Sequence, residues 1–231
     1  MISYRYTWMI HDYIESVVDQ REYQRAGGTC WRNPFSCFMC HAANILLQQY
    51  MNKTINDAVI LDGTYGEGRF WKACKKRIRM LIGVDIYDRK KIVAPDIFIK
   101  GDIVSSKTID ALREYAPFDL IVIDPPYSTG ITSTYARPAD HANSFQWERI
   151  VKNIDKLATL QESSAVLLVK GMIRHGSNGI DYATTPFFIS DNAHSYRLMH
   201  ILYYRIIHRR RTTVKRLVYN NYVYVAVLVR K

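Results

Sequence analysis

Four consecutive residues, Asp124-Pro125-Pro126-Tyr127, have the chemistry to bind a planar group that carries an amino group. They follow residues 118–123, an apolar run of strand length. The two prolines remove two backbone donors and fix φ, so the neighbouring carbonyls point outward in a set geometry. Neither proline fits inside a central strand, which places the motif at the strand's C-terminal end. Ligands bind at that end in open α/β sheets.

A second candidate site is the loop Asp62-Gly63-Thr64-Tyr65-Gly66-Glu67-Gly68-Arg69-Phe70, which joins an expected strand to an expected helix. Its glycines allow the backbone to approach a ligand closely. The spacing of Gly63, Gly66 and Gly68 departs from the Gly-x-Gly-x-x-Gly of dinucleotide sites, and Asp62 precedes them. Diphosphates prefer helix N–H groups without a nearby carboxylate. The loop therefore suits a cationic amino-acid group better.

Two further carboxylates follow expected strands. Asp85 comes roughly 20 residues after the glycine loop, the position of an acid that binds ribose hydroxyls. Asp102 follows the next expected strand. Each acid taken alone is equally explained by a turn or a helix cap. Together, the four acids fall at or just after the ends of four successive strands, namely Asp62, Asp85, Asp102 and Asp124. This pattern predicts that they belong to one site at one edge of the sheet.

The Asp124–Tyr127 motif resembles the catalytic motif of S-adenosylmethionine-dependent amino-methyltransferases of the DNA N6-adenine and N4-cytosine type. The glycine loop is similar to the first cofactor motif of the same enzymes. The resemblance implies S-adenosylmethionine as cofactor, and Asp124, Pro125, Pro126 and Tyr127 as catalytic residues. It implies that the Asp124 carboxylate and the Pro125 carbonyl accept from the amine while Tyr127 stacks on the base. No metal is expected.

The resemblance also implies a set of cofactor-binding residues, in which Asp102 accepts from the adenine amino group. The set is Pro34, Phe35, Asp62, Gly63, Gly66, Gly68, Asp85, Ile86, Asp102 and Asp124. Pro34 and Phe35 belong to Asn33-Pro34-Phe35-Ser36, which matches the family loosely. Ordinary helix capping by Asn33 or Ser36 explains that segment nearly as well.

The pattern of elements predicts an α/β fold. Strands are expected at 58–62, 80–85, 96–100, 118–124 and 164–170, and helices at 67–77, 106–115 and 144–160. Two more strands, at 196–207 and 217–229, are close enough in sequence to pair antiparallel. This plan matches the Rossmann-like methyltransferase fold, a mainly parallel seven-stranded sheet with a C-terminal antiparallel hairpin. Residues 58–231 would form the methyltransferase domain, and 1–57 a helical N-terminal extension packed on its core.

The formal net charge is +11, from 32 Lys and Arg against 21 Asp and Glu, which favours a nucleic-acid partner. A solvated basic face without a partner is the alternative. The expected nucleic-acid contacts are Arg137, Arg209, Arg210, Arg211, Lys215 and Arg216. The sequence has no apolar run of about 18 residues for a membrane helix. The N-terminus lacks the features of a signal peptide, so a cytoplasmic location is expected.

Three of the four cysteines lie close together, at Cys30, Cys37 and Cys40, and are followed by His41. Such a cluster is compatible with a zinc site. A second Cys-x2-Cys pair is absent, and Cys40 and His41 point about 100° apart on a helix. Buried free cysteines in a reducing cytoplasm are therefore the expectation, without a disulfide framework.

The motif that begins with Asp rather than Ser is seen mostly in N6-adenine enzymes of the family it resembles. The resemblance thus implies methylation of adenine N6 in DNA. An RNA methyltransferase acting on adenine N6 or guanine N2 is the first alternative, and a non-catalytic nucleic-acid-binding subunit the second. The strands expected between Asp62 and Asp124 leave no room there for a target-recognition domain. Recognition would fall to the hairpin or a partner subunit, and a homodimer is compatible with this.

Overall fold

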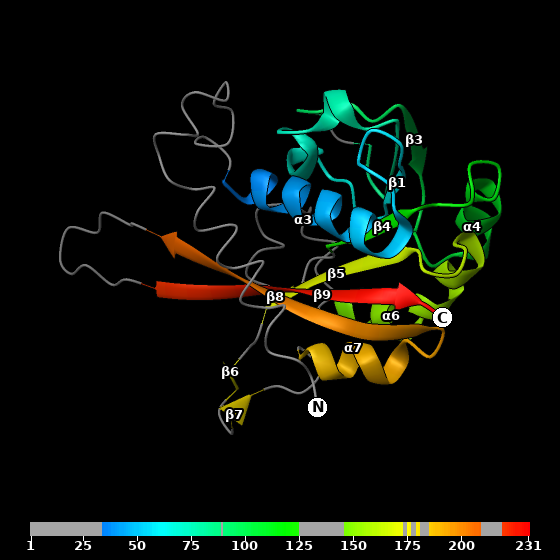
Figure 1. The fold of residues 1–231 in the computed structure, drawn as a ribbon. Coiled ribbons are helices and arrows are strands. Elements are labelled where there is room, and N and C mark those ends of the chain that lie inside the picture. The colour runs from blue at the N-terminus through cyan, green and yellow to red at the C-terminus, as the bar shows by residue number, and fades with distance from the viewer. Residues whose placement is uncertain are drawn as a thin grey trace.

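The computed structural model describes residues 34–88, 90–124, 146–172, 175–176, 179–180, 185–208 and 219–231. Seven strands of this part form one sheet, in the order β3-β2-β1-β4-β5-β9-β8 (Figure 1). They are β1 (Val59–Asp62), β2 (Met80–Asp85), β3 (Ile97–Lys100), β4 (Leu120–Ile123), β5 (Val166–Met172), β8 (Tyr196–His208) and β9 (Tyr219–Arg230). A separate ribbon pairs β6 (His175–Gly176) with β7 (Gly179–Ile180).

The first five strands run parallel, and β9 is antiparallel to both β5 and β8. The predicted fold class, with its C-terminal hairpin, is therefore confirmed. The strand order reverses between β1 and β4, because the chain first adds β2 and β3 on one side of β1. Ligands bind at such a switch point, outside the carboxyl ends of the strands.

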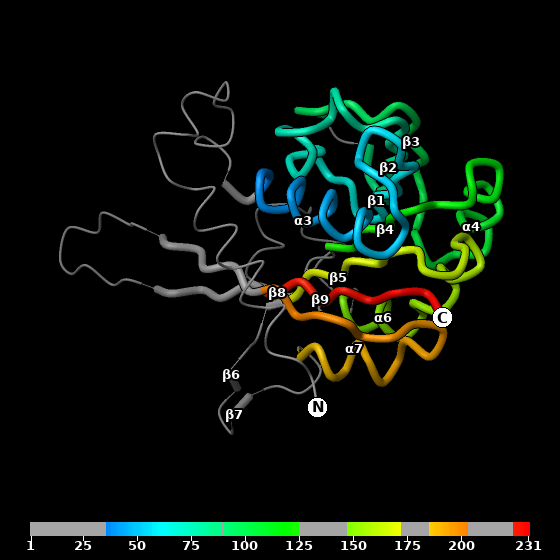
Figure 2. Tube along the Cα trace, in the orientation of Figure 1, coloured from blue at the N-terminus to red at the C-terminus, as the bar shows by residue number. Residues whose placement is uncertain are grey.

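Helices cover both faces of the sheet, with α3 on one face and α6 and α7 on the other (Figure 1). The helices are α3 (Pro34–Met51), α4 (Ser106–Leu112), α6 (Gln146–Lys152) and α7 (Pro186–Asn192), with 3-10 turns η2 (Arg69–Trp71), η3 (Lys75–Arg77) and η5 (Ile154–Leu160). The tube in Figure 2 follows the same path from α3 to the end of β9. No helix in the described part of the chain is long and apolar enough to cross a membrane.

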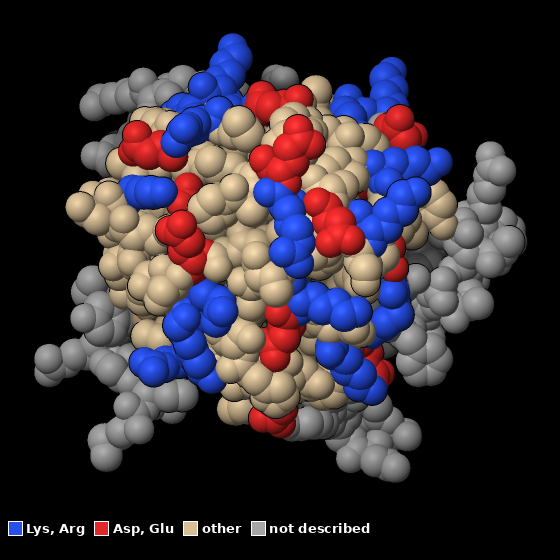
Figure 3. Space-filling view, turned by 90° about the vertical axis from the view of Figure 1, so that its right-hand side faces the viewer, with Lys and Arg blue, Asp and Glu red and all other residues tan. Residues whose placement is uncertain are grey.

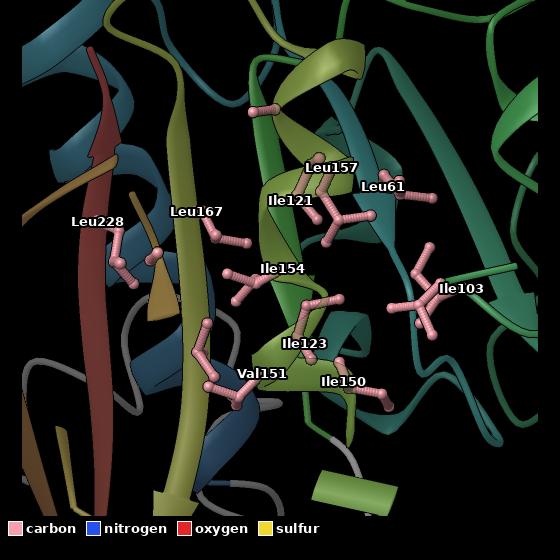
Figure 4. Packing of buried hydrophobic residues seen from close by; sticks show 14 of the residues in the cluster. Leu61, Ile103, Ile121, Ile123, Ile150, Val151, Ile154, Leu157, Leu167 and Leu228 are labelled. Atoms are coloured by element: carbon pink, nitrogen blue, oxygen red, sulfur yellow. The ribbon is translucent and has the colours of Figure 1, made fainter. Parts of the chain in front are cut away.

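The two faces of the sheet bury separate apolar clusters. One joins Leu61 and Ile121 to Val151, Ile154 and Leu157, which come from α6 and η5 (Figure 4). The other packs α3 against the opposite face of the same strands. Strand β4 is buried along its whole length, since both clusters cover it. This rigid centre carries the residues that follow β1 and β4.

Two of the predicted helices are wrong in detail. Residues 67–77 form two 3-10 turns instead of one helix. Gly68 precedes η2 with φ +77°, and Cys74 precedes η3 with φ −135°, so neither has helical backbone. Of the expected helix 144–160, the described residues 146–160 divide into α6 and η5 at Asn153, whose φ is −112°.

The cysteine prediction is also wrong. Cys40 of α3 and Cys74 form a disulfide with a Cα–Cα distance of 6.0 Å, and Cys37 is disulfide-bonded as well. None of the cysteines in the described residues is free. A thiol in a disulfide is not a zinc ligand, so Cys40 does not support the zinc alternative. The cytoplasmic location loses the support of free thiols and stays a prediction.

The Cys40–Cys74 bond ties α3 to the segment that follows the glycine loop, residues 62–70, across 34 residues of sequence. A crosslink that closes a loop of this length stabilises by about 2–4 kcal/mol, so the double variant Cys40→Ser/Cys74→Ser should melt at a lower temperature. Peptide mapping without reductant should recover residues 40 and 74 in one linked species. Labelling of both thiols by an alkylating reagent in the native protein would contradict the pairing.

Candidate active site

Four carboxylates line the carboxyl edge of the sheet. Asp62 and Asp85 end β1 and β2, Asp102 follows β3, and Asp124 follows β4 directly. Because these strands are neighbours in the order β3-β2-β1-β4, the acids lie along one edge at the switch point. The structure thus places the four acids at or just after the ends of four successive strands, as predicted.

Asp62 is almost fully buried, with 1% of its surface exposed. The Trp71 indole Nε1 donates to its Oδ2 at 2.8 Å, and the Thr64 backbone N–H donates to Oδ1 at 3.1 Å. Burial raises the pKa of Asp62 to about 7, and the negative charges of Asp124 and Asp85 add to the rise. The hydrogen bonds oppose it, because they favour the ionised form. Asp62 is therefore a carboxyl group that changes charge near neutral pH.

Asp85 is fixed by the backbone of the loops around it. The Gly66 N–H donates to Oδ2 and the Tyr87 N–H to Oδ1, both at 2.8 Å. An ionised carboxylate has about four acceptor positions, so backbone groups in the described part of the chain use half of them. The next side chain, Ile86, is 44% exposed. Asp85 and Ile86 thus combine acceptors for hydroxyl groups with an adjoining apolar surface.

The glycines of the loop are required by different features of the structure. A Cβ on Gly63 would meet Ile123 Cδ1 at 2.6 Å, and one on Gly68 would meet the Val93 carbonyl oxygen. Close packing within the protein therefore explains these two positions. A Cβ on Gly66, whose φ is +54°, would meet nothing within 4 Å. Space for a ligand beside the loop backbone is supported at Gly66.

The two glycines with positive φ offer a matched pair of substitutions. Gly68→Ala adds a clash with backbone to the strain of a left-handed residue, and should destabilise by about 3 kcal/mol or more. Gly66→Ala bears the strain alone, about 1–2 kcal/mol. Urea unfolding of both variants measures the difference. Equal losses would show that the contact between Gly68 and Val93 does not constrain the loop.

Asp102 has partners within the protein. Its Oδ2 accepts from Arg149 at 2.7 Å, and its Oδ1 from the Val104 N–H at 3.2 Å. Its side chain is 29% exposed. The turn and the ion pair account for this residue without a ligand. The contact of Asp102 with an adenine amino group remains a prediction. If it forms, Asp102 would accept from both the adenine amino group and Arg149.

Asp124 is fixed by hydrogen bonds with Thr64 of the glycine loop and Lys170 of β5. Its backbone N–H donates to Thr64 Oγ1 at 2.6 Å, and its Oδ2 accepts from Lys170 Nζ at 2.7 Å. The Lys170 ammonium lies 5.3 Å from the centroid of the Phe70 ring, and the Lys170 carbonyl accepts from the Trp147 indole at 3.1 Å. Asp124 thereby joins the glycine loop, β4 and β5.

Sequence reasoning missed Lys170 and Trp71. A signal for Lys170 was present, because Asp124 and Lys170 end the consecutive expected strands 118–124 and 164–170, and consecutive strands usually lie side by side. The register pairs Ile123 with Val169, which makes the residues that follow them, Asp124 and Lys170, the next to meet. Trp71 has no comparable signal, since its contact with Asp62 depends on the irregular turn η2.

The other predicted site residues are placed less fully. Pro34 and Phe35 begin α3, and their side chains lie outside the described part. Pro125, Pro126 and Tyr127 also lie outside the described residues, as do Arg137, Arg209, Arg210, Arg211, Lys215 and Arg216. Within the described ranges, no three His, Cys, Asp or Glu residues are grouped so as to hold a metal ion.

The sequence matches no family model and no curated protein. The fold is similar to that of an S-adenosylmethionine-dependent methyltransferase from Anabaena variabilis ATCC 29413, with a TM-score of 0.52 at 9% identity over 81% of this chain and 83% of that one. It is also similar to a candidate methyltransferase, SMU.776, complexed with S-adenosylhomocysteine, with a TM-score of 0.50 at 13% identity over 82% of this chain. At such identities the likeness establishes a Rossmann-like methyltransferase fold.

A candidate hemolysin from Streptococcus thermophilus shares the fold as well, with a TM-score of 0.51 at 10% identity over 80% of this chain. The chain spans 63% of the length of that protein and 48% of SMU.776. The fold therefore occurs in proteins described in different terms, and the reaction of this chain has to be argued from its own site.

Proposed function

We propose that this protein is an S-adenosylmethionine-dependent methyltransferase that acts on an exocyclic amino group of a nucleic-acid base, with N6 of adenine in DNA as the leading substrate. The observation that carries the proposal is the row of Asp62, Asp85, Asp102 and Asp124 along the carboxyl edge of a methyltransferase-type sheet. The sequence Asp124–Tyr127 supports the choice of an amino group as acceptor.

The residues at this edge fit the cofactor. Asp85 has acceptor positions for the ribose hydroxyls, the space beside Gly66 admits a ligand, and the exposed Ile86 offers apolar contact to a flat ring. Asp62 in its ionised form would attract the cationic amino-acid part. When bound, S-adenosylmethionine supplies a methyl group whose bond to sulfur breaks, leaving the electron pair on sulfur, as a bond to the amine nitrogen forms.

Asp124 would receive the amine. An aromatic amine is a poor nucleophile because its lone pair is delocalised into the ring. Hydrogen bonds from the NH2 group to the Asp124 carboxylate and the Pro125 carbonyl would favour a pyramidal nitrogen with a localised lone pair. Asp124 acts here as an acceptor that orients the amine, and one amine proton leaves to solvent after the methyl group has moved. Position and electrostatics would supply most of the rate.

The basic residues of the hairpin support a nucleic-acid substrate. Residues 209–218 contain Arg209, Arg210, Arg211, Lys215 and Arg216 and no acidic residue. The strand ends that they connect, His208 of β8 and Tyr219 of β9, are paired and extend beyond the carboxyl end of β5. These paired strand ends therefore lie on the side of the sheet that carries the carboxylates.

The opposite edge has a different charge pattern. Figure 3 shows the side of the molecule where the parallel strands begin, and Lys and Arg alternate there with Asp and Glu. A mixed surface of this kind does not attract a polyanion strongly. Nucleic acid is therefore not expected to approach from this opposite edge.

Transfer of tritiated methyl from S-adenosylmethionine to duplex DNA and to total RNA tests the proposal. Mass spectrometry of the digested product would identify the nucleoside. N6-methyladenine in DNA is the expected product, and excess S-adenosylhomocysteine should inhibit its formation. Label in RNA alone would favour the RNA methyltransferase alternative. Absence of transfer to both, with the cofactor still bound, would favour a non-catalytic nucleic-acid-binding subunit.

A further inference from the structure

Lys170 and Asp124 form an ion pair fixed by the sheet. Nζ and Oδ2 are 2.7 Å apart, and the side chains are 11% and 18% exposed. The β4–β5 register pairs Val122 with Leu168 and Ile123 with Val169, so residues 124 and 170 follow as neighbours. Most surface ion pairs contribute little because their side chains are mobile and solvated. This pair is largely shielded from water and is placed by buried strands.

The lysine is also held by elements outside β5. Trp147 of α6 donates its indole N–H to the Lys170 carbonyl, and the ammonium lies 5.3 Å from the centroid of the Phe70 ring of η2. A cation within about 6 Å of an aromatic face is attracted to it. Lys170 is therefore fixed by contacts from α6 and η2, and it holds one oxygen of Asp124.

The consequence concerns the other oxygen. Within the described part of the chain, Lys170 is the partner of Asp124 Oδ2, and Oδ1 accepts from no group there. An amine at the end of β4 would thus meet Oδ1 of a carboxylate whose charge Lys170 already balances. An alkyl amine is cationic at neutral pH, and it would find a neutral pair and a repelling ammonium. The amine of a nucleobase is uncharged and meets no such repulsion.

We propose that Lys170 is a positioning residue that orients Asp124 and makes the site select an uncharged amine over an alkylammonium group. This inference rests on the proposed function and narrows its substrate class. The residue acts through Asp124 without touching the substrate, so its effect should disappear when Asp124 is changed.

A double-variant cycle tests this dependence. Lys170→Met should lower kcat for nucleic-acid methylation about 100-fold through loss of carboxylate orientation, with a much smaller change in the KM for S-adenosylmethionine. Lys170→Arg, which keeps the charge, should restore most of the rate. In an Asp124→Asn background, Lys170→Met should have little further effect. Full additivity of the two changes would overturn the inference.

The Lys53–Asp119 pair supplies a matched control. It has the same N–O distance, 2.7 Å, and Asp119 immediately precedes β4, at the end away from the site. Lys53→Met should leave the methylation rate unchanged. A loss as large as that of Lys170→Met would mean that breaking any ion pair on this strand perturbs the enzyme, and would overturn the assignment.

Ligand selectivity gives a readout that needs no turnover. With its lysine removed, Asp124 should favour cationic S-adenosylmethionine over neutral S-adenosylhomocysteine, shifting the ratio of their Kd values about fivefold from that of the wild type.

Poly-L-lysine serves as the alkylammonium acceptor in a separate activity assay, and the wild type should not methylate it. An unchanged ratio in Lys170→Met, or ready methylation of poly-L-lysine, overturns the inference alone. Failure of the wild type to bind both cofactor forms overturns the proposed function, and this inference with it.

Discussion

Replacing Asp124 by alanine should reduce methyl transfer by about 1,000-fold, the usual cost of removing a group that orients and stabilises at the reaction centre. The substitution removes the acceptor for the amine and leaves the Lys170 ammonium without its carboxylate. The Thr64 hydroxyl would still accept from the backbone of residue 124, so the strand end should keep its place. Tritiated methyl transfer measures the effect.

Stability has to be measured beside activity, because loss of one member of a shielded ion pair destabilises the protein. Asp124→Asn keeps the shape of the side chain and is the better-folded comparison. Asp110→Ala is a control, since the Asp110 side chain on α4 is 71% exposed and should leave the rate unchanged. A correctly folded Asp124→Ala protein that retained a tenth of the wild-type rate would exclude Asp124 from the catalytic role.

The second large effect is a loss of stability as pH rises, due to Asp62. Burial raises the pKa of this carboxyl from 3.8 to about 7 in the folded protein. Between these values the folded protein keeps a proton that the unfolded chain has lost, so stability falls with increasing pH. The difference of about three between the two pKa values corresponds to roughly 4 kcal/mol of unfolding free energy. The folded protein loses all of this stabilisation above pH 7.

Asp62→Asn should remove this dependence, because asparagine does not titrate in this range and still offers an oxygen to the Trp71 indole. The difference in unfolding free energy between wild type and variant, measured by urea titration at several pH values, isolates Asp62 from the histidines. His41 and His200 also titrate, and burial lowers the pKa of both. A difference that stays constant from pH 4 to pH 8 would contradict the burial of an ionisable Asp62.

The same carboxyl should make cofactor affinity depend on pH. If ionised Asp62 attracts the cationic amino-acid part, the ionised fraction for a pKa near 7 rises about tenfold between pH 6 and pH 8, and affinity should follow. Calorimetry with S-adenosylhomocysteine measures the trend. Methylthioadenosine, which lacks the amino-acid part, should show no contribution from Asp62. The same pH dependence for both ligands would place the amino-acid group elsewhere.

The sheet was predictable because its strands are short, buried and rich in branched apolar residues. Strand β2 has the bounds expected from the sequence, Met80–Asp85, and the other parallel strands differ by one or two residues at their ends. An Asp at the end of such a strand is visible in the sequence as well. For this reason the alignment of Asp62, Asp85 and Asp124 with strand ends could be predicted.

The contacts of those carboxylates could not be predicted to the same extent. The hydrogen bond between Trp71 and Asp62 depends on the 3-10 turn η2. This turn follows the left-handed Gly68 and stands where a helix was expected. The Cys40–Cys74 bond joins residues 34 positions apart, and cysteine spacing does not reveal pairing. These features depend on tertiary packing, which local patterns do not encode.

The carboxyl edge of the sheet should bind S-adenosylmethionine, and calorimetric titration with the product S-adenosylhomocysteine measures binding at this edge. The wild type should bind, and Asp85→Asn should bind about tenfold or more weakly, since it loses charged hydrogen bonds to the ribose. Asp96→Asn, at the amino end of β3 where the carboxylate accepts from the Leu81 N–H, should bind like the wild type. Absence of binding by the wild type, or equal affinity in Asp85→Asn, would show that the cofactor does not bind at this edge.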